Sequence, residues 1–472
     1  MKPSIFNIRV PLKERDDVFL LNTLTDAQLV VSPDVAALLD RTSFEFLTEN
    51  EREAVDLLTE NGFFVPDHET DRRRLDDYFH RIKHSRDELH ITVLTTLQCN
   101  FACGYCYQGD REDFNQFAEK MTLETSARLA EWIERELDRL RPPTFAMTFF
   151  GGEPLLNLPV VYDLAERTWK ATQSRGIRQT LSIITNGLLL TEDVVNRLEP
   201  CGLRSVKVTL DGDRDTHDRM RPLRGGQGTF DRIIENIRKV AHRTRISIGG
   251  NFDESSADSF PALLDFISKQ EFADRLVRVN FKPIVRDTDP RPTAPSLKNM
   301  LPLIPVSASG KPLGGTCMTS AGAGGGSTCD SCSFLDEKMA MLREDTHRHG
   351  LPGPTGIPGG PCHVHHKNAH TIGPDGSLYA CPGFTGEKAL STGHISGKTD
   401  AWRETNQRKF DTLDPWKECG DCAYMPTCAG GCLTASYAQL GDVNTPTCHK
   451  PTFESAVIAL ANRVSAQQET VQ

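Results

Sequence analysis

Cysteines are the residues in this chain whose number and spacing most clearly suggest chemistry. The sequence contains 14 of them in 472 residues, and their distribution is uneven. Three lie within residues 99–106, three within 317–332 and seven within 362–448, whereas Cys201 stands alone. Thiolates gathered in short segments are the ligands of zinc ions or iron–sulfur clusters. In a reducing compartment this distribution predicts metal sites rather than disulfides.

The first group has the spacing C-x3-C-x2-C, formed by Cys99, Cys103 and Cys106 in the segment QCNFACGYCYQGD. Iron–sulfur clusters are normally held by four thiolates, so three would leave one iron open to a small molecule. A structural zinc ion takes four ligands, and no fourth candidate lies nearby in the sequence. The spacing therefore favours a cluster with an open iron over a zinc knuckle.

A regular alternation of apolar strands and amphipathic helices between residues 86 and 285 predicts the scaffold for these thiols. Strands are expected at 90–97, 144–150, 179–185, 205–210, 245–252 and 275–284, with helices at 122–140, 160–173, 191–201, 229–242 and 259–270. Such alternation builds a parallel sheet with right-handed crossovers. Six strands suit an α/β fold of the partial (β/α)6 barrel type, whose active-site residues follow the carboxyl ends of the strands.

Polar and glycine residues follow these predicted strands closely. They are Gly151, Gly152 and Glu153 after the second strand, Thr185, Asn186 and Gly187 after the third, Thr209, Asp211, Gly212, Asp218 and Arg221 at and after the fourth, and Asn251 at the end of the fifth. Glycine lets a backbone approach a ligand closely, and a carboxylate accepts hydrogen bonds from an ammonium group. Asn-Gly and Asp-Gly pairs are also ordinary turns, so the order of the whole set carries more weight than any member.

Together, the C-x3-C-x2-C segment and the strand-end residues resemble the motifs of radical S-adenosylmethionine enzymes over about residues 90–285. The resemblance implies a [4Fe–4S] cluster on the three cysteines, whose open iron chelates the amino and carboxylate groups of S-adenosylmethionine. It also implies that electron transfer cleaves the sulfonium and yields a 5′-deoxyadenosyl radical, which abstracts hydrogen from the substrate. The implied cofactor contacts are Tyr105 near the adenine, Gly151, Gly152 and Glu153 at the methionyl amino group, Asn186, Thr209 at the ribose or carboxylate, and Arg221 at the carboxylate.

The downstream cysteines resemble the seven-cysteine SPASM extension of peptide and protein maturases, over residues 362–448. The resemblance implies two auxiliary [4Fe–4S] clusters, one held by Cys419, Cys422, Cys428 and Cys448 and the other by Cys362, Cys381 and Cys432. The second set lacks one ligand, for which Cys329 and Cys332 are the main candidates and Cys317 a weaker one. An open auxiliary iron that binds a substrate thiolate is the alternative, and a pair of structural zinc sites is the competing interpretation of the region.

Four segments are expected along the chain. Residues 1–85 are predicted to form a winged-helix-like module with strands at 18–24 and 27–31, helices at 32–41 and 47–63, and a capping box of Thr48 and Glu51. This module resembles the peptide-recognition elements of peptide maturases. Residues 86–285 form the barrel, 286–360 a linker rich in Gly, Pro and Ser, and 361–472 a loop-rich cluster domain that ends in a helix at 452–468.

Composition excludes several functional classes. The net charge is -10 with no basic run, which argues against a nucleic acid partner. No apolar stretch approaches the roughly 20 residues of a membrane helix, so no membrane partner is expected. The first 17 residues lack the apolar core of a signal peptide, and we therefore expect a cytoplasmic protein.

The resemblance to SPASM maturases implies a ribosomally made peptide or protein as substrate, and a low-potential reductant such as flavodoxin or ferredoxin. Sulfatase-maturing relatives carry an aspartate after the matching Cys-Pro pair, whereas Cys381 and Pro382 are followed by glycine, which disfavours formylglycine formation. Thioether crosslinking is the leading reaction, because an auxiliary iron can hold a thiolate sulfur. A carbon–carbon crosslink, oxidation of a non-peptide substrate, and a non-catalytic zinc-binding module are the alternatives.

Two remaining features are expected to be structural. Cys201 is predicted to be a small buried apolar residue. The histidines beside Cys362 are expected to be solvated or to neighbour a metal site rather than to bind metal themselves, and they are His363, His365, His366 and His370.

Overall fold

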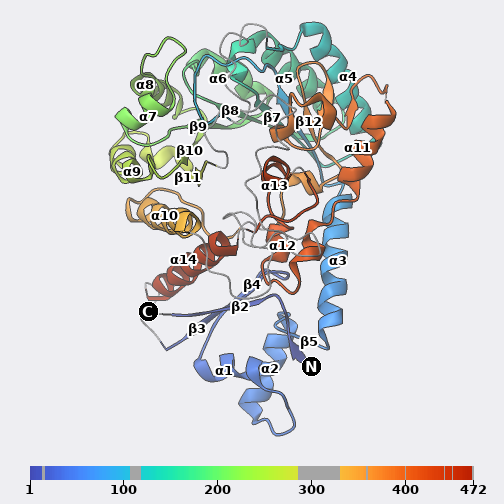
Figure 1. Ribbon diagram of the computed structural model, residues 1–472, viewed down its shortest axis with the longest axis vertical. Coiled ribbons are helices and arrows are strands. Elements are labelled where there is room, and N and C mark those ends of the chain that lie inside the picture. Colours follow the sequence, from blue (N-terminus) through green and yellow to red (C-terminus); the bar gives the residue numbers. More distant parts are fainter. Residues whose placement is uncertain are drawn as a thin grey trace.

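The computed structural model describes most of the chain, apart from residues 13–15, 107–117, 285–329, 358–359, 399, 441, 449 and 470–472. Three regions follow one another along the long axis in Figure 1: a barrel at one end, a cysteine-bearing region in the middle and the N-terminal module at the other end.

The six predicted strands of the barrel are confirmed. They are β6 (Glu88–Leu94), β7 (Thr144–Phe150), β8 (Arg178–Thr185), β9 (Leu203–Thr209), β10 (Arg245–Phe252) and β11 (Leu276–Pro283). All neighbours pair in parallel, in the order β11-β10-β9-β8-β7-β6. Because β-branched and aromatic side chains fill these strands, they fit a pleated, buried surface. The α/β class and the partial barrel are therefore as expected.

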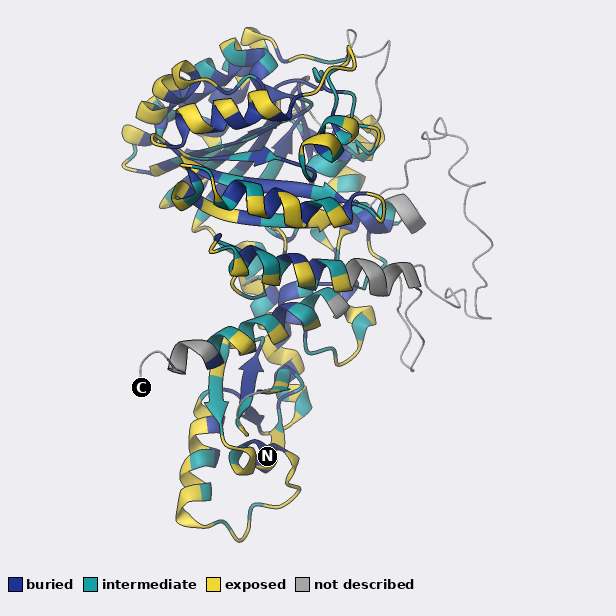
Figure 2. Ribbon diagram, turned by 90° about the vertical axis from the view of Figure 1, so that its left-hand side faces the viewer, coloured by how far each residue is buried: buried dark blue, intermediate teal, exposed yellow. Residues whose placement is uncertain are grey.

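Helices cover the outer face of this sheet. They are α4 (Leu123–Leu140), α5 (Leu158–Gln173), α6 (Glu192–Leu198), α7 (Arg214–Met220), α8 (Phe230–Val240) and α9 (Phe260–Ser268). In β7, Phe145, Met147 and Phe149 are buried while the alternate residues are less so, which places the apolar core between the strands and the helices (Figure 2). The other face of each strand is thereby left to line the inside of the barrel.

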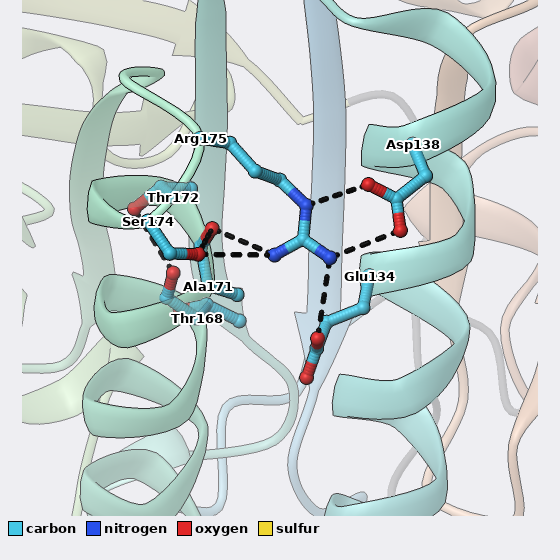
Figure 3. Close-up of polar contacts among 7 residues, drawn as sticks. All are labelled: Glu134, Asp138, Thr168, Ala171, Thr172, Ser174 and Arg175. Atoms are coloured by element: carbon cyan, nitrogen blue, oxygen red, sulfur yellow. Dashed lines mark hydrogen bonds and ion pairs between the residues drawn. The ribbon is translucent and has the colours of Figure 1, made fainter.

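Arg175 clamps two of the covering helices together (Figure 3). Its guanidinium donates to both carboxylate oxygens of Asp138 on α4, at 2.8 and 3.0 Å, and to Glu134 at 3.4 Å. A third nitrogen donates to the carbonyl of Ala171 on α5 at 2.8 Å. This bidentate ion pair lies on the outer surface of the barrel, so we assign it to helix packing rather than to the site.

Three short strands extend the barrel sheet to nine. Strand β12 (Ala369–Ile372) pairs in parallel with β6, followed by β13 (Ser377–Tyr379) and β14 (Gly393–His394) in antiparallel pairing. Helices α11 (Ala401–Asp411), α12 (Met425–Cys428) and α13 (Leu433–Leu440) follow, and the expected closing helix is α14 (Lys450–Glu469). The cysteine-bearing region is thus joined to the barrel by backbone hydrogen bonds, which its loop-rich sequence did not suggest.

The expected linker over 286–360 is wrong in its second half. Residues Asp330–Arg348 form helix α10, which packs against β11, α9 and α14. Met339 and Leu342 are buried within the barrel core. The apolar spacing of these residues was outweighed by the Gly- and Pro-rich composition on either side, so the helix was missed.

The N-terminal module contains a three-stranded antiparallel sheet of β2 (Asn7–Pro11), β3 (Val18–Asn22) and β4 (Ala27–Val31). Helices α1 (Pro33–Ala37) and α2 (Glu49–Glu60) follow, and the capping box of Thr48 and Glu51 at the start of α2 is confirmed. Strand β1 (Lys2–Pro3) pairs with β5 (Phe64–Val65). The strands β3 and β4 and the helices α1 and α2 lie where the sequence predicted them, whereas β2 was not foreseen.

Helix α3 (His68–His84) leads from this module along the cysteine-bearing region to the barrel (Figure 1). Phe79 of α3 stacks on Trp416 with ring centroids 4.1 Å apart, and Phe6 and Met425 belong to the same buried cluster. A bidentate ion pair between Arg72 and Asp421 lies beside it. The module therefore rests on the segment that carries Cys419 and Cys422.

Within the described ranges, no helix has both the length and the apolar character needed to cross a membrane.

The core around the buried strand β8 is predicted to contribute strongly to the free energy of unfolding. Ile183 of β8 has no exposed surface, so Ile183→Ala should lower the free energy of unfolding by about 2–5 kcal/mol, because a cavity replaces packed methyl groups. Ile458→Ala on α14 is the matched control, since that side chain is 45% exposed and its loss should cost only about 0.5 kcal/mol. Urea denaturation followed by circular dichroism measures both; similar losses would contradict the assigned core.

Candidate functional site

The loop after β6 carries the first three cysteines and is clamped by backbone hydrogen bonds. The amide of Ala102 donates to the carbonyl of Pro222 at 2.9 Å, and the amide of Arg224 donates to that of Asn100 at 3.1 Å. Phe101 is buried and bridges to Leu223. The segment after α7 therefore fixes the part of the loop that lies between Cys99 and Cys103.

The three thiols converge at the carboxyl ends of the barrel strands. Burial, partly offset by a hydrogen bond from the Phe101 amide and reinforced by Glu153, Cys103 and Cys106, raises the pKa of Cys99 to about 12. Burial likewise raises the pKa of Cys103 to about 11, partly offset by Arg221. Without a metal these two thiols are therefore neutral at pH 7, and binding iron would release their protons.

Two glycines at the end of β7 allow this loop to approach. The amide of Gly152 donates to the carbonyl of Thr96 at 2.9 Å, and that of Glu153 donates to Gln98 at 2.8 Å. A Cβ at Gly152 would lie 2.1 Å from the Gln98 oxygen, and one at Gly151 would lie 2.3 Å from the Thr96 oxygen. Gly151 also has a φ of +141°. Side chains at either position would push the loop away from the strand end.

The carboxylate of Glu153 is fully buried and joins β7 to β8. It accepts hydrogen bonds from the hydroxyl of Thr185 at 2.8 Å and from the amides of Asn186 and Leu155 at 2.8 and 3.0 Å. The side chain of Asn186 donates in turn to Asn100 at 2.7 Å. This network ties the third strand end to the cysteine loop, so Glu153 and Asn186 lie beside the thiols as the sequence predicted.

A second buried network contains Tyr105, Asp211 and Arg221. The Tyr105 hydroxyl donates to Asp211 and accepts from Arg221, and the Asn251 side chain donates to it at 3.3 Å. Burial raises the pKa of Tyr105 well above its ordinary value, so the phenol remains protonated. The amide of Asn251 donates to Asp211 at 2.7 Å. These contacts join the cysteine loop to β9 and β10.

The remaining predicted contact, Thr209, is half-buried at the end of β9, in register with Gly249 of β10. All seven predicted cofactor residues thus lie near the same edge of the barrel. Two residues in these networks were missed: Asn100 bonds Asn186, and buried His217 accepts a hydrogen bond from the amide of Asp211 at 3.1 Å. No local pattern marked either residue.

The downstream cysteines fall into two groups in space. Burial, reinforced by the neighbouring Cys419, Cys422 and Cys448, raises the pKa of Cys428 to about 12. Burial raises the pKa of Cys381 to about 11, and its neighbouring charges come from Cys362 and Cys432. These are the same two sets that the resemblance to the SPASM extension implied.

Two glycines form the turn between Cys428, which belongs to one thiol group, and Cys432, which belongs to the other. Gly430 and Gly431 have φ values of +84° and +97° between Cys428 and Cys432. A Cβ at Gly431 would lie 2.1 Å from the carbonyl oxygen of Thr447. Thr447 precedes Cys448, and its hydroxyl accepts from the amide of Cys432 at 2.9 Å. The turn therefore sends Cys428 and Cys432 to different groups.

Three predicted or considered ligands cannot be placed. Cys317 and Cys329 lie outside the described residues, and Cys332 belongs to α10 at a position where the side chain is not described. Cys201 is buried within the barrel core, as expected.

Comparison with known proteins agrees with this geometry. Residues 93–258 match the model of the Radical SAM superfamily. The chain contains a radical SAM domain. This similarity implies S-adenosylmethionine and one [4Fe–4S] cluster as the cofactors of the domain.

Curated relatives share the domain rather than the whole chain. Fe-coproporphyrin III synthase of Methanosarcina barkeri is 27% identical over 194 residues, which cover 41% of this chain and 44% of that protein. GTP 3′,8-cyclase of Synechococcus sp. strain WH7803 is 33% identical over 151 residues, covering 31% of this chain and 41% of that protein. The chain thus spans about half the length of the curated relatives it matches.

Solved structures extend the similarity of fold beyond the radical SAM domain. The protein anSMEcpe with bound AdoMet has a TM-score of 0.54 at 15% identity, covering 81% of this chain and 98% of that one. The same protein with bound AdoMet and the Cp18Cys peptide has a TM-score of 0.53 at 16% identity, covering 82% of this chain and 100% of that one.

The contact between the glycines and the cysteine loop predicts a sensitive position. Gly152→Ala should reduce S-adenosylmethionine cleavage about a hundredfold, because the new Cβ displaces the Gln98 carbonyl and moves the thiols. The measurement is 5′-deoxyadenosine formation after dithionite reduction. Gly393→Ala is the matched control, since its Cβ would meet Leu378 at an ordinary 3.4 Å. Equal activity of the two variants would contradict the assigned contact.

Proposed function

We propose that this protein is a radical S-adenosylmethionine maturase that modifies a ribosomally made peptide or protein and forms thioether crosslinks. The observation that carries the proposal is the convergence of two further thiol groups on a region whose strand β12 continues the barrel sheet. Such an arrangement combines a radical-generating site with additional metal sites in one rigid unit.

The residues at the barrel edge fit the cofactors that the domain implies. Cys99, Cys103 and Cys106 would hold the cluster, which supplies the electron that cleaves the bound sulfonium. Gly151 and Gly152 lack the Cβ atoms that would displace the carbonyls of Thr96 and Gln98, so they hold the cysteine loop at the strand end where the cofactor would bind. Arg221 supplies a buried positive charge near Cys103, which suits a carboxylate.

The grouping of the downstream thiols supports iron–sulfur clusters. Cys419, Cys422, Cys428 and Cys448 supply the four thiolates that a cluster normally takes, and Cys362, Cys381 and Cys432 supply three. We therefore propose two auxiliary [4Fe–4S] clusters on these two groups, in place of a pair of structural zinc sites.

A peptide substrate is supported by the fold and by the N-terminal module. The similar protein anSMEcpe was solved with a bound peptide. Strand β4 ends the order β2-β3-β4, so its outer edge offers backbone groups to an added strand. We propose that a leader segment of the substrate pairs there, while the residue to be modified reaches the barrel edge.

Thioether formation is the reaction that the second thiol group supports best. Cys362, Cys381 and Cys432 give three ligands, and Cys381 is followed by Pro382 and Gly383 rather than by a carboxylate. In a balanced reaction, the acceptor carbon gives one hydrogen atom to the adenosyl group and the substrate thiol gives one proton. One electron would leave as the carbon–sulfur bond forms, and a cluster held by Cys362, Cys381 and Cys432 would be its acceptor. A low-potential flavodoxin or ferredoxin is the proposed electron donor.

Metal content tests the cluster assignment. Anaerobically reconstituted protein should contain about twelve irons, and Cys99→Ala should contain about eight and lose S-adenosylmethionine cleavage. Cys428→Ala should also contain about eight irons but retain the thiols of the radical site. Cys201→Ala is the matched control and should keep about twelve, since this thiol lies within the core. Zinc in place of iron, or no cleavage by fully reconstituted protein, would overturn the proposal.

Product analysis tests the reaction. A cysteine-containing substrate peptide should become lighter by two hydrogen atoms for each crosslink, and the reacting cysteine should resist iodoacetamide. Tandem mass spectrometry locates the new bond. A product whose cysteines all remain open to alkylation would exclude thioether formation and favour a carbon–carbon crosslink or another oxidation.

A further inference from the structure

Three side chains of metal-binding types meet at the start of β6, at the opposite end of that strand from the cysteine loop. None of them is a cysteine. One ligand atom each from Glu88, His90 and His363 lies within 4.8 Å of the others. Glu88 and His90 are partly buried, and His363 is exposed. Two imidazoles and one carboxylate form a ligand set that transition metals occupy in proteins.

The backbone holds these residues together from two distant parts of the chain. Glu88 and His90 are two residues apart on β6, so both side chains point to the same face. His363 begins the 3-10 helix His363–His365, which lies just before β12. The amide of His90 donates to the carbonyl of Asn368 at 2.9 Å, and Ala369 pairs with His90 in the parallel ladder. The sheet thus fixes the spacing between the two segments.

The side chains are already in mutual contact. The Nδ1 atom of His90 lies 3.2 Å from a carboxylate oxygen of Glu88, and the rings of His90 and His363 have centroids 4.1 Å apart. His366 lies next in line, with its ring centroid 5.4 Å from that of His363. Residues three apart eclipse each other in a 3-10 turn, which brings His366 to the same side.

The packing of the histidine rings alone does not explain why the carboxylate of Glu88 lies among them. Within the described ranges, Glu88 forms an ion pair with His90 and with no lysine or arginine. A carboxylate beside several imidazoles is a favourable place for a cation, and the partial exposure of the group leaves room for water ligands. Magnesium and calcium prefer oxygen ligands alone, so they fit this set poorly.

We propose that Glu88, His90 and His363 bind a divalent transition metal ion such as zinc, with His366 able to supply a further imidazole. The ion would link β6 to His363, the residue that follows Cys362. It would thereby fix Cys362, a proposed ligand of an auxiliary cluster, relative to the barrel. This revises the expectation from sequence that the histidines beside Cys362 do not bind metal. The site requires no thiol and does not depend on the proposed substrate.

Metal titration of the iron-loaded holoenzyme tests the site. After anaerobic reconstitution, zinc sulfate is added, unbound metal is removed, and zinc and iron are counted by mass spectrometry. Wild-type protein should retain about one zinc in addition to its iron. Both His90→Ala and Glu88→Gln should bind zinc at least about tenfold more weakly while keeping the same iron content. X-ray absorption at the zinc edge should show nitrogen and oxygen neighbours and no sulfur.

His242→Ala is the matched control. His242 is an exposed histidine 4.0 Å from Glu192, so it reproduces a single histidine–carboxylate pair without the second imidazole. This variant should bind zinc as the wild type does. Absence of zinc from the wild type, equal affinity in His90→Ala and Glu88→Gln, or sulfur scattering at the zinc would each overturn the proposal. Because Glu88→Gln preserves shape, it separates loss of the site from loss of the fold.

Discussion

The close backbone contact between the β7 turn and the cysteine loop is the constraint on which the site depends. Gly151 and Gly152 allow the carbonyls of Thr96 and Gln98 to lie where Cβ atoms would otherwise stand. From that contact, Glu153 reaches β8 and the Tyr105 network reaches β9 and β10. One loop is thus held by four successive strand ends, which preorganises three thiols before any metal arrives.

The same sheet that holds this loop also carries the auxiliary region. Because β12 pairs with β6, the strand that leads into Cys99 lies directly beside the strand that follows Cys362. The glycine turn at Gly430 and Gly431 then divides the remaining thiols between two groups. The relative positions of the thiol groups are therefore set by backbone hydrogen bonds and turns, which respond little to changes in surface side chains.

The local sequence pattern was sufficient to predict the strands and helices of the barrel, since alternating apolar residues and strong helical periodicity mark each element separately. It also placed Glu153 and Arg221 after their strands, and because parallel strands end at a common edge, the two residues lie at the same end of the barrel. It failed for α10, whose apolar spacing is flanked by Gly- and Pro-rich sequence, and for β12, which is short and needs β6 as its partner. Asn100 and the meeting of His90 with His363 depend on contacts between distant segments, which no local period encodes.

The packing of the N-terminal module has a consequence for how the protein responds to iron starvation. Phe6, Phe79 and Trp416 form one cluster with Met425, and Cys419 and Cys422 pack against it. Where thiolates bind metal, the free energy of binding is also free energy of folding for the segment that supplies them. Loss of the cluster proposed for Cys419, Cys422, Cys428 and Cys448 would therefore loosen the surface on which the module rests. Under the proposed function, metal binding and substrate capture would be thermodynamically linked.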